Sequence, residues 1–121
     1  MSSVIDPAIE VGPKVVEIQP SPLQDVLVRA AEIVEAGWTQ WTFARDENGT
    51  DVAYDNPRAV KFCMWGAFYL AYKEKFGVEY GEDDALNREM DKKGMDASWN
   101  DLPERTQEQV VTRLREIALQ F

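Results

Sequence analysis

The chain has no histidine and only one cysteine among its 121 residues. Hydrolases with a thiol or hydroxyl nucleophile usually need a histidine base beside it, and structural zinc sites usually take four cysteine or histidine ligands. The apolar neighbours of Cys63 predict a buried thiol with a raised pKa, which is a poor nucleophile. We therefore expect no catalytic residue, no metal and no cofactor, and we favour a non-enzymatic protein.

Basic residues are also scarce, because 13 lysines and arginines stand against 22 aspartates and glutamates, for a net charge of −9. This balance argues against direct nucleic-acid binding and against docking on anionic membranes, both of which need clustered positive charge. It suits a protein partner with a basic surface, or solubility alone. The acids concentrate between residues 78 and 104, where a candidate acidic interaction surface consists of Glu79, Glu82, Asp83, Asp84, Glu89 and Asp91.

The sequence has no apolar run long enough to span a membrane, and no signal peptide is visible, because Asp6, Pro7 and Glu10 interrupt any apolar stretch near the start. Together with the lone cysteine, this predicts a cytoplasmic protein. The prolines up to residue 22 prevent a long helix at the beginning of the chain. We expect an extended leader over residues 1–20, in which residues 15–18 could form a strand, and a single helical domain over residues 21–121.

The most apolar part of the chain predicts a central core helix over residues 57–76. Asn56 suits its N-cap, Pro57 suits the first helical position, and Gly77 suits the left-handed position after its end. Gly66, inside this helix, indicates that another element packs closely there, either the first helix or residues 38–41.

Three other helices are predicted, one from Ser21 to Gly37, one at about residues 82–92 and one from Thr106 to about residue 118. The first and last open with capping boxes, S-x-x-Q and T-x-x-Q. The Asn-Gly pair at residues 48–49, between two β-prone runs, predicts a small hairpin at about residues 39–54. The fold class is therefore mainly α (α+β), with about four helices around the central one and a structured loop over residues 96–103.

One group of polar and aromatic residues could form a ligand pocket. It comprises Trp38, Gln40, Cys63, Trp99, Asn100 and Asp101. The same residues have a structural interpretation, in which the Trp99 ring packs on the core while Asn100 or Asp101 accepts hydrogen bonds from backbone N–H groups. The sequence leaves both interpretations open.

Several short motifs occur in a fixed order along the chain: GW-x-Q from Gly37, an A-R-D-x-x-G hairpin from Ala44, C-x-x-G-A from Cys63, and W-N-D from Trp99. In this combination the chain resembles an uncharacterised family of small proteins from bacteria, especially actinobacteria, and their phages. The resemblance extends from residue 23 to about residue 118. It implies a bacterial or phage origin and supports the fold, but it implies no activity. Trp41 stands where the family pattern has a glycine.

Three functions follow as hypotheses. The first is a small acidic protein-interaction module without enzymatic activity. The second is an inhibitor that mimics nucleic acid, in which the acids of residues 79–104 would occupy the basic groove of a host defence nuclease. The third is a small-ligand protein that uses the candidate pocket. A minor virion component would be a special case of the first.

Overall fold

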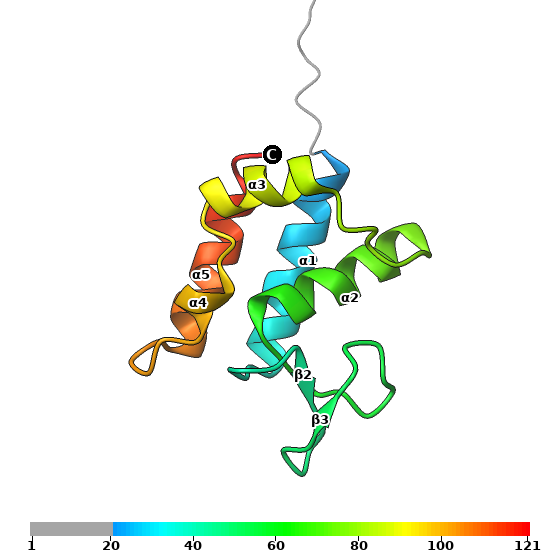
Figure 1. The fold of residues 1–121 in the computed structure, drawn as a ribbon, viewed down its shortest axis with the longest axis vertical. Helices are drawn as coiled ribbons and strands as arrows, with labels where there is room; N and C mark the ends of the chain where they lie inside the picture. Colours follow the sequence, from blue (N-terminus) through cyan, green and yellow to red (C-terminus); the bar gives the residue numbers. More distant parts are fainter. Residues whose placement is uncertain (1–20) are drawn as a thin grey trace, which may run out of the picture.

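The computed structural model describes residues 21–121, so the predicted leader and its strand at residues 15–18 lie outside the described residues. This part of the chain forms five helices and a small three-stranded antiparallel sheet, which confirms the mainly α (α+β) class. Figure 1 shows the sheet at one end of the molecule and the C-terminus at the other. None of the helices between residues 21 and 121 is long and apolar enough to cross a membrane.

Helix α1, Pro22–Ala36, packs side by side with α5, Gln107–Ala118, and both predicted N-caps are present. Ser21 accepts a hydrogen bond from the Gln24 N–H at 3.1 Å, and Thr106 forms the complete capping box with Gln109. The side chain of Gln24 does not close the first box. It donates instead to the carbonyl of Ala118 at 2.9 Å and so joins the start of α1 to the end of α5.

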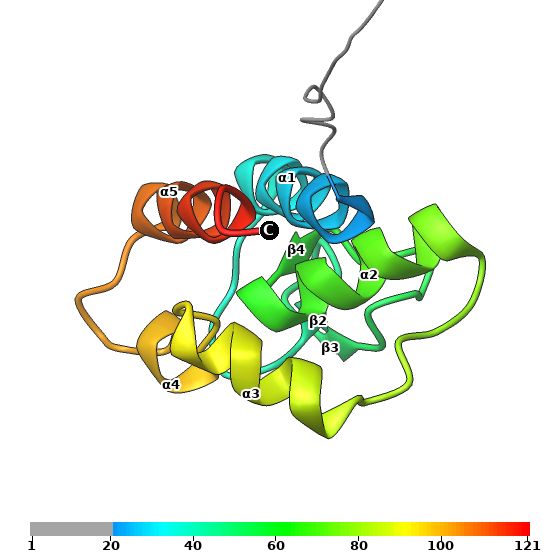
Figure 2. The ribbon, with the colours of Figure 1, turned by 90° about the horizontal axis from the view of Figure 1, so that it is seen from above.

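Helix α2, Met64–Phe76, is the predicted central helix, and Figure 2 shows it between the pair α1–α5 and the pair α3–α4. It begins at Met64, so the predicted start at Pro57 is wrong. Asn56 accepts from the Arg58 N–H at 2.8 Å and closes a turn, which an Asn-Pro pair favours as readily as a helix start. The end is as predicted, with Gly77 in the left-handed region at φ 76°.

Lys61 and Phe62, which were expected to lie within the helix, form a strand instead. Strand β2, Ala44–Arg45, pairs on one side with β3, Asp51–Val52, and on the other with β4, Lys61–Phe62. The first pair is the predicted hairpin, whose turn Asp46 closes by accepting from two backbone N–H groups. The Phe62 backbone also bonds to residues 37 and 39, so the sheet is fixed to the end of α1.

Helix α3, Asp84–Lys92, corresponds to the predicted helix at about residues 82–92 and begins after its cap Asp83. Met90 is buried, Leu86 is half-buried and Ala85 is exposed. The predicted loop at residues 96–103 contains a single helical turn, α4, Ala97–Asn100.

Gly66 of α2 is in contact with the backbone of the segment that leads into β2. A Cβ atom at this position would lie 2.1 Å from the carbonyl oxygen of Phe43. That oxygen is fixed in place, since it accepts from the Cys63 N–H at 3.2 Å. The glycine is therefore required for close approach, as predicted, although the neighbour is residue 43 and not residues 38–41.

Candidate functional site

Asn100 is fully buried, and its side chain joins three segments that are distant in sequence. Its Oδ1 atom accepts from the Trp38 indole N–H at 3.0 Å and from the Met64 N–H at 3.2 Å. Its Nδ2 atom donates to the Thr39 carbonyl at 3.3 Å and to Asp101 Oδ1 at 2.9 Å. All four hydrogen-bonding positions of the amide are thus filled. We call this arrangement the Asn100 joint.

Three further bonds attach the segment after α1 to this joint. Gln40 donates from Nε2 to the carbonyls of Asn100 at 3.0 Å and Leu102 at 2.8 Å. Asp101 Oδ1 accepts from the Trp41 N–H at 2.9 Å. The Asn100 joint therefore holds the backbone of residue 41 in a defined position.

Cys63 lies at the start of α2 as its N-cap, with its Sγ atom accepting from the Gly66 N–H at 3.3 Å. Burial raises the pKa of the thiol, as the apolar sequence around it predicts. Within the described residues, no group of three or more histidine, cysteine, aspartate or glutamate side chains is placed to hold a metal ion.

The Trp99 ring contacts residues outside the Asn100 joint. It lies between two guanidinium groups, Arg105 at 3.9 Å and Arg113 at 3.8 Å from the ring centroid. The six residues of the predicted pocket therefore do not surround one cavity. Trp38, Gln40, Asn100 and Asp101 satisfy one another's hydrogen bonds, and Trp99 lies apart from them. The signal for the joint was present in the W-N-D motif, whose structural interpretation describes this geometry.

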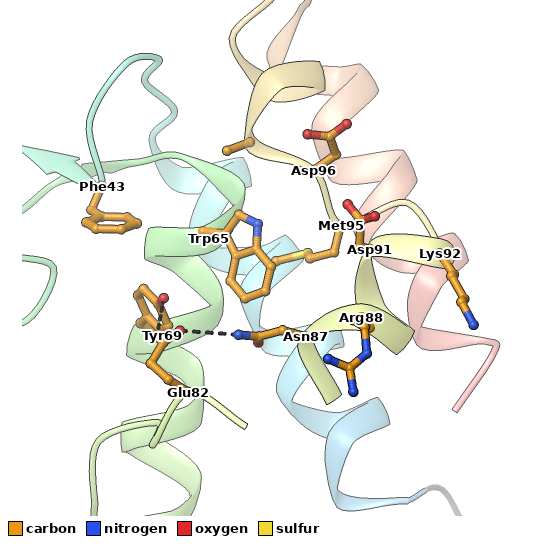
Figure 3. A pocket seen from close by; sticks show the side chains of 11 residues that line it. Phe43, Trp65, Tyr69, Glu82, Asn87, Arg88, Asp91, Lys92, Met95 and Asp96 are labelled. Carbon is orange, nitrogen blue, oxygen red and sulfur yellow. Dashed lines mark hydrogen bonds between the residues drawn. The ribbon is translucent and has the colours of Figure 1, made fainter. Parts of the chain in front are cut away.

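A hollow lies elsewhere, between α2 and α3, and we call it the aromatic groove (Figure 3). Its volume is about 630 Å³, and it is open to solvent. Its apolar lining consists of Phe43, Trp65, Tyr69, Met95 and Ala97, and its polar lining of Glu82, Asn87, Arg88, Asp91, Lys92 and Asp96.

Glu82 connects the two sides of this groove. Its Oε2 atom accepts from the Tyr69 hydroxyl at 2.5 Å and its Oε1 atom from Asn87 Nδ2 at 3.3 Å, as Figure 3 shows. Burial, followed by the hydrogen bond to Glu82, raises the pKa of the Tyr69 phenol. The phenol therefore keeps its proton and remains a hydrogen-bond donor throughout the neutral range.

A second hollow of about 380 Å³ adjoins the aromatic groove, since both are lined by Phe43 and Ala97. Its remaining lining includes Trp41, Cys63 and Asp101. Trp41 is 70% exposed and Phe43 is 49% exposed. These two exposed rings, together with the rings of Trp65 and Tyr69, form a surface that we call the aromatic surface.

Two non-glycine residues between positions 21 and 121 have a positive φ, Trp41 at 72° and Glu82 at 56°. This left-handed conformation costs an L-residue roughly 1–2 kcal/mol. Glu82 lines the aromatic groove and Trp41 lines the second hollow, and hydrogen bonds hold both residues. A glycine at position 41 would adopt the same backbone without strain.

The candidate acidic residues are placed around α3, but they differ in their surroundings. Asp83 caps the helix, Glu82 is engaged with Tyr69, and Glu89 pairs with Lys93 at 2.8 Å. Asp91 lines the aromatic groove, and Glu79 and Asp84 are exposed. Arg88 and Lys92 follow Asp84 at intervals of four residues, so two bases follow one acid along one exposed face of the helix.

Sequence reasoning missed the aromatic groove. Phe43, Trp65 and Tyr69 come from two segments whose proximity depends on the contact between Phe43 and Gly66. The one available signal was the abundance of aromatic residues within residues 62–72, which the sequence analysis assigned to a fully buried helix.

Fold and site together define a small, mainly α protein in which a hydrogen-bonded asparagine joint supports an exposed aromatic surface. The chain belongs to the family of unknown function DUF6197, whose family model matches residues 19–120. Comparison with curated proteins and with solved structures gives no match. The resemblance to an uncharacterised family is thereby confirmed.

Proposed function

We propose that this protein is a non-enzymatic interaction module that binds another protein through its aromatic surface. The observation that carries the proposal is the placement of both strained non-glycine residues, Trp41 and Glu82, at the hollows of this surface. Backbone strain persists where the surrounding structure enforces it, and it concentrates at functional sites.

The identity of the strained residue adds to this argument. A tryptophan that is 70% exposed contributes little to the core, yet the Asn100 joint fixes its backbone. Tryptophan and tyrosine are enriched among the residues that dominate binding energy at protein interfaces. A contiguous exposed patch of such rings on a small protein marks an interaction site.

The nucleic-acid mimic has less support, because a mimic needs a continuous acidic face. On α3 the bases Arg88 and Lys92 interrupt that face, and Lys93 neutralises Glu89.

A small-ligand protein is a second candidate, supported by the aromatic groove, whose volume of about 630 Å³ is in the range of ligand sites. We propose that the protein acts in the cytoplasm of a bacterial cell, encoded by the bacterium or by a phage.

The test is affinity capture from a lysate of the organism that encodes the protein, with wild type and a Trp41→Gly variant compared by quantitative mass spectrometry. Glycine relieves the strain at φ 72°, so the variant should have a thermal midpoint equal to or above that of wild type. We expect at least one stoichiometric partner of wild type to be lost from the variant.

The matched control is Leu119→Ala, which removes another exposed apolar side chain, 80% exposed, at the end of the molecule opposite the sheet. It should keep the partner. A partner retained by a folded Trp41→Gly variant, or lost equally from both variants, would contradict binding through the aromatic surface.

A further inference from the structure

We propose that the aromatic groove receives an arginine side chain from a basic segment of the partner protein. This inference rests on the proposed function and names the chemistry of the partner at one part of the aromatic surface. The argument uses the rings that line the groove, the carboxylates beside them and the charge of the whole chain.

The apolar lining suits a flat cation with an aliphatic stem. The Tyr69 ring lies 5.3 Å from Phe43 and 5.8 Å from Trp65, centroid to centroid, so the three rings form one connected cluster. Met95 is buried beside them. Guanidinium groups bind aromatic faces through cation–π contacts, while the methylene stem of arginine packs on apolar surface. The molecule already uses this contact once, at Trp99 with Arg105 and Arg113.

Two carboxylates beside the rings have capacity for an incoming cation. Asp91 forms no ion pair with any residue from 21 to 121, and Asp96 uses only Oδ1, which accepts from the Ser98 N–H at 2.9 Å. Glu82 does not compete, because Tyr69 and Asn87 occupy both of its oxygens. Figure 3 shows Asp91 and Asp96 near Trp65 and Met95, whereas Lys92 extends away from the ring.

The net charge of the chain also favours a basic partner segment. At −9, the protein attracts basic segments over long range and repels acidic ones. Arginine suits the groove better than lysine, because its planar fork can stack on a ring and donate to two carboxylates at once. The expected partner segment is therefore basic, with an arginine that is free to insert.

The test is a titration of the full chain, followed by NMR at the indole N–H signals of its four tryptophans. The probe is the peptide acetyl-Gly-Arg-Gly-Arg-Gly-amide, and its matched control carries citrulline, which is neutral and nearly isosteric, in place of both arginines. A Trp65→Phe variant assigns the Trp65 signal. We expect a saturable shift of that signal with the arginine peptide and about tenfold weaker binding of the citrulline peptide.

The variant Asp91→Asn/Asp96→Asn removes both charges while asparagine still caps α4, so the fold should persist. It should bind the arginine peptide about tenfold more weakly than wild type. The control Glu104→Gln/Glu116→Gln changes the net charge equally at exposed positions outside the groove and should bind as wild type does.

Equal binding of the two peptides, no shift of the Trp65 signal at millimolar peptide, or equal losses in both double variants would overturn the inference. Its failure is separable from that of the proposed function. Loss of the natural partner from the Trp41→Gly variant, with no arginine binding in the groove, would leave an interaction module whose partner presents different chemistry.

Discussion

Gly66 is a residue at which the architecture tolerates little change. Its bare Cα faces the Phe43 carbonyl, and both belong to segments that carry the rings of the aromatic surface. A single methyl group at this position would push apart α2 and the segment that leads into β2. The aromatic groove thus depends on the absence of one side chain.

We predict that Gly66→Ala lowers the free energy of unfolding by about 1–3 kcal/mol, although alanine is the better helix former. The cause is the predicted 2.1 Å approach of the new Cβ to a carbonyl oxygen that is itself hydrogen-bonded. The measurement is urea denaturation, with Gly81→Ala as the control, because nothing lies within 4 Å of a Cβ at residue 81. Equal stability of the two variants would contradict the close contact.

Among the elements, α2 has the least ordinary beginning, since its cap is a cysteine. Serine, threonine, aspartate and asparagine are the usual N-caps, because their oxygen atoms accept strongly from the first N–H groups of the helix. Cys63 performs this role with sulfur, a weak acceptor, in a buried position.

We predict that Cys63→Ala lowers the free energy of unfolding by about 1 kcal/mol, because it leaves the Gly66 N–H without its acceptor. Cys63→Ser should be closer to wild type, since its hydroxyl can accept from the same group. Thermal denaturation of both variants measures the difference. Equal destabilisation by alanine and serine would indicate that packing of the sulfur atom, and not capping, is the contribution of Cys63.

The sequence correctly predicts those features of the elements that depend on nearby residues alone. The caps at Ser21 and Thr106, the hairpin turn and the left-handed Gly77 all follow from residue preferences within a few positions. The start of α2 does not. Residues 57–62 are compatible with a helix by local preference, and the pairing of β4 with β2, between segments more distant in sequence, decides against it.

The candidate site likewise has one part that the sequence predicts and one part that it does not. The W-N-D motif predicts that polar side chains fix the loop before α5, and the Asn100 joint is that structure. The aromatic groove could not be predicted, because its lining is brought together by the contact of Gly66 with Phe43 and by the position of α3. Gly66 indicates that some element packs closely against it but does not identify Phe43, and the position of α3 has no signature in the sequence.

For the whole molecule, three tyrosines contribute to how stability depends on alkaline pH. Burial raises the pKa of the Tyr54, Tyr69 and Tyr80 phenols above the ordinary value of 10.0. Above that value the unfolded chain loses phenolic protons that the native protein retains, so unfolding is favoured as the pH rises. The stabilisation from these groups is therefore complete below about pH 10 and is lost progressively above it.

We predict that the urea midpoint is nearly constant from pH 7 to about pH 9 and falls above about pH 10. Tyr69→Phe should lower the midpoint at neutral pH, since it removes the bond to Glu82, but should make the alkaline fall shallower. Denaturation at pH 8 and pH 11 for both proteins gives the two slopes. An equally steep fall in the variant would show that Tyr69 does not contribute to it.

The Asn100 joint also bears on the rates of folding and unfolding. Three of its four bonds connect residues that are 36 to 62 positions apart, so it cannot form until long loops have closed and α2 and α4 have reached their places. Interactions that form after the rate-limiting step leave the folding rate nearly unchanged and slow the reverse reaction. The bonds of Asn100 should therefore slow unfolding. They should thereby lengthen the time for which the Trp41 ring is held exposed to a partner.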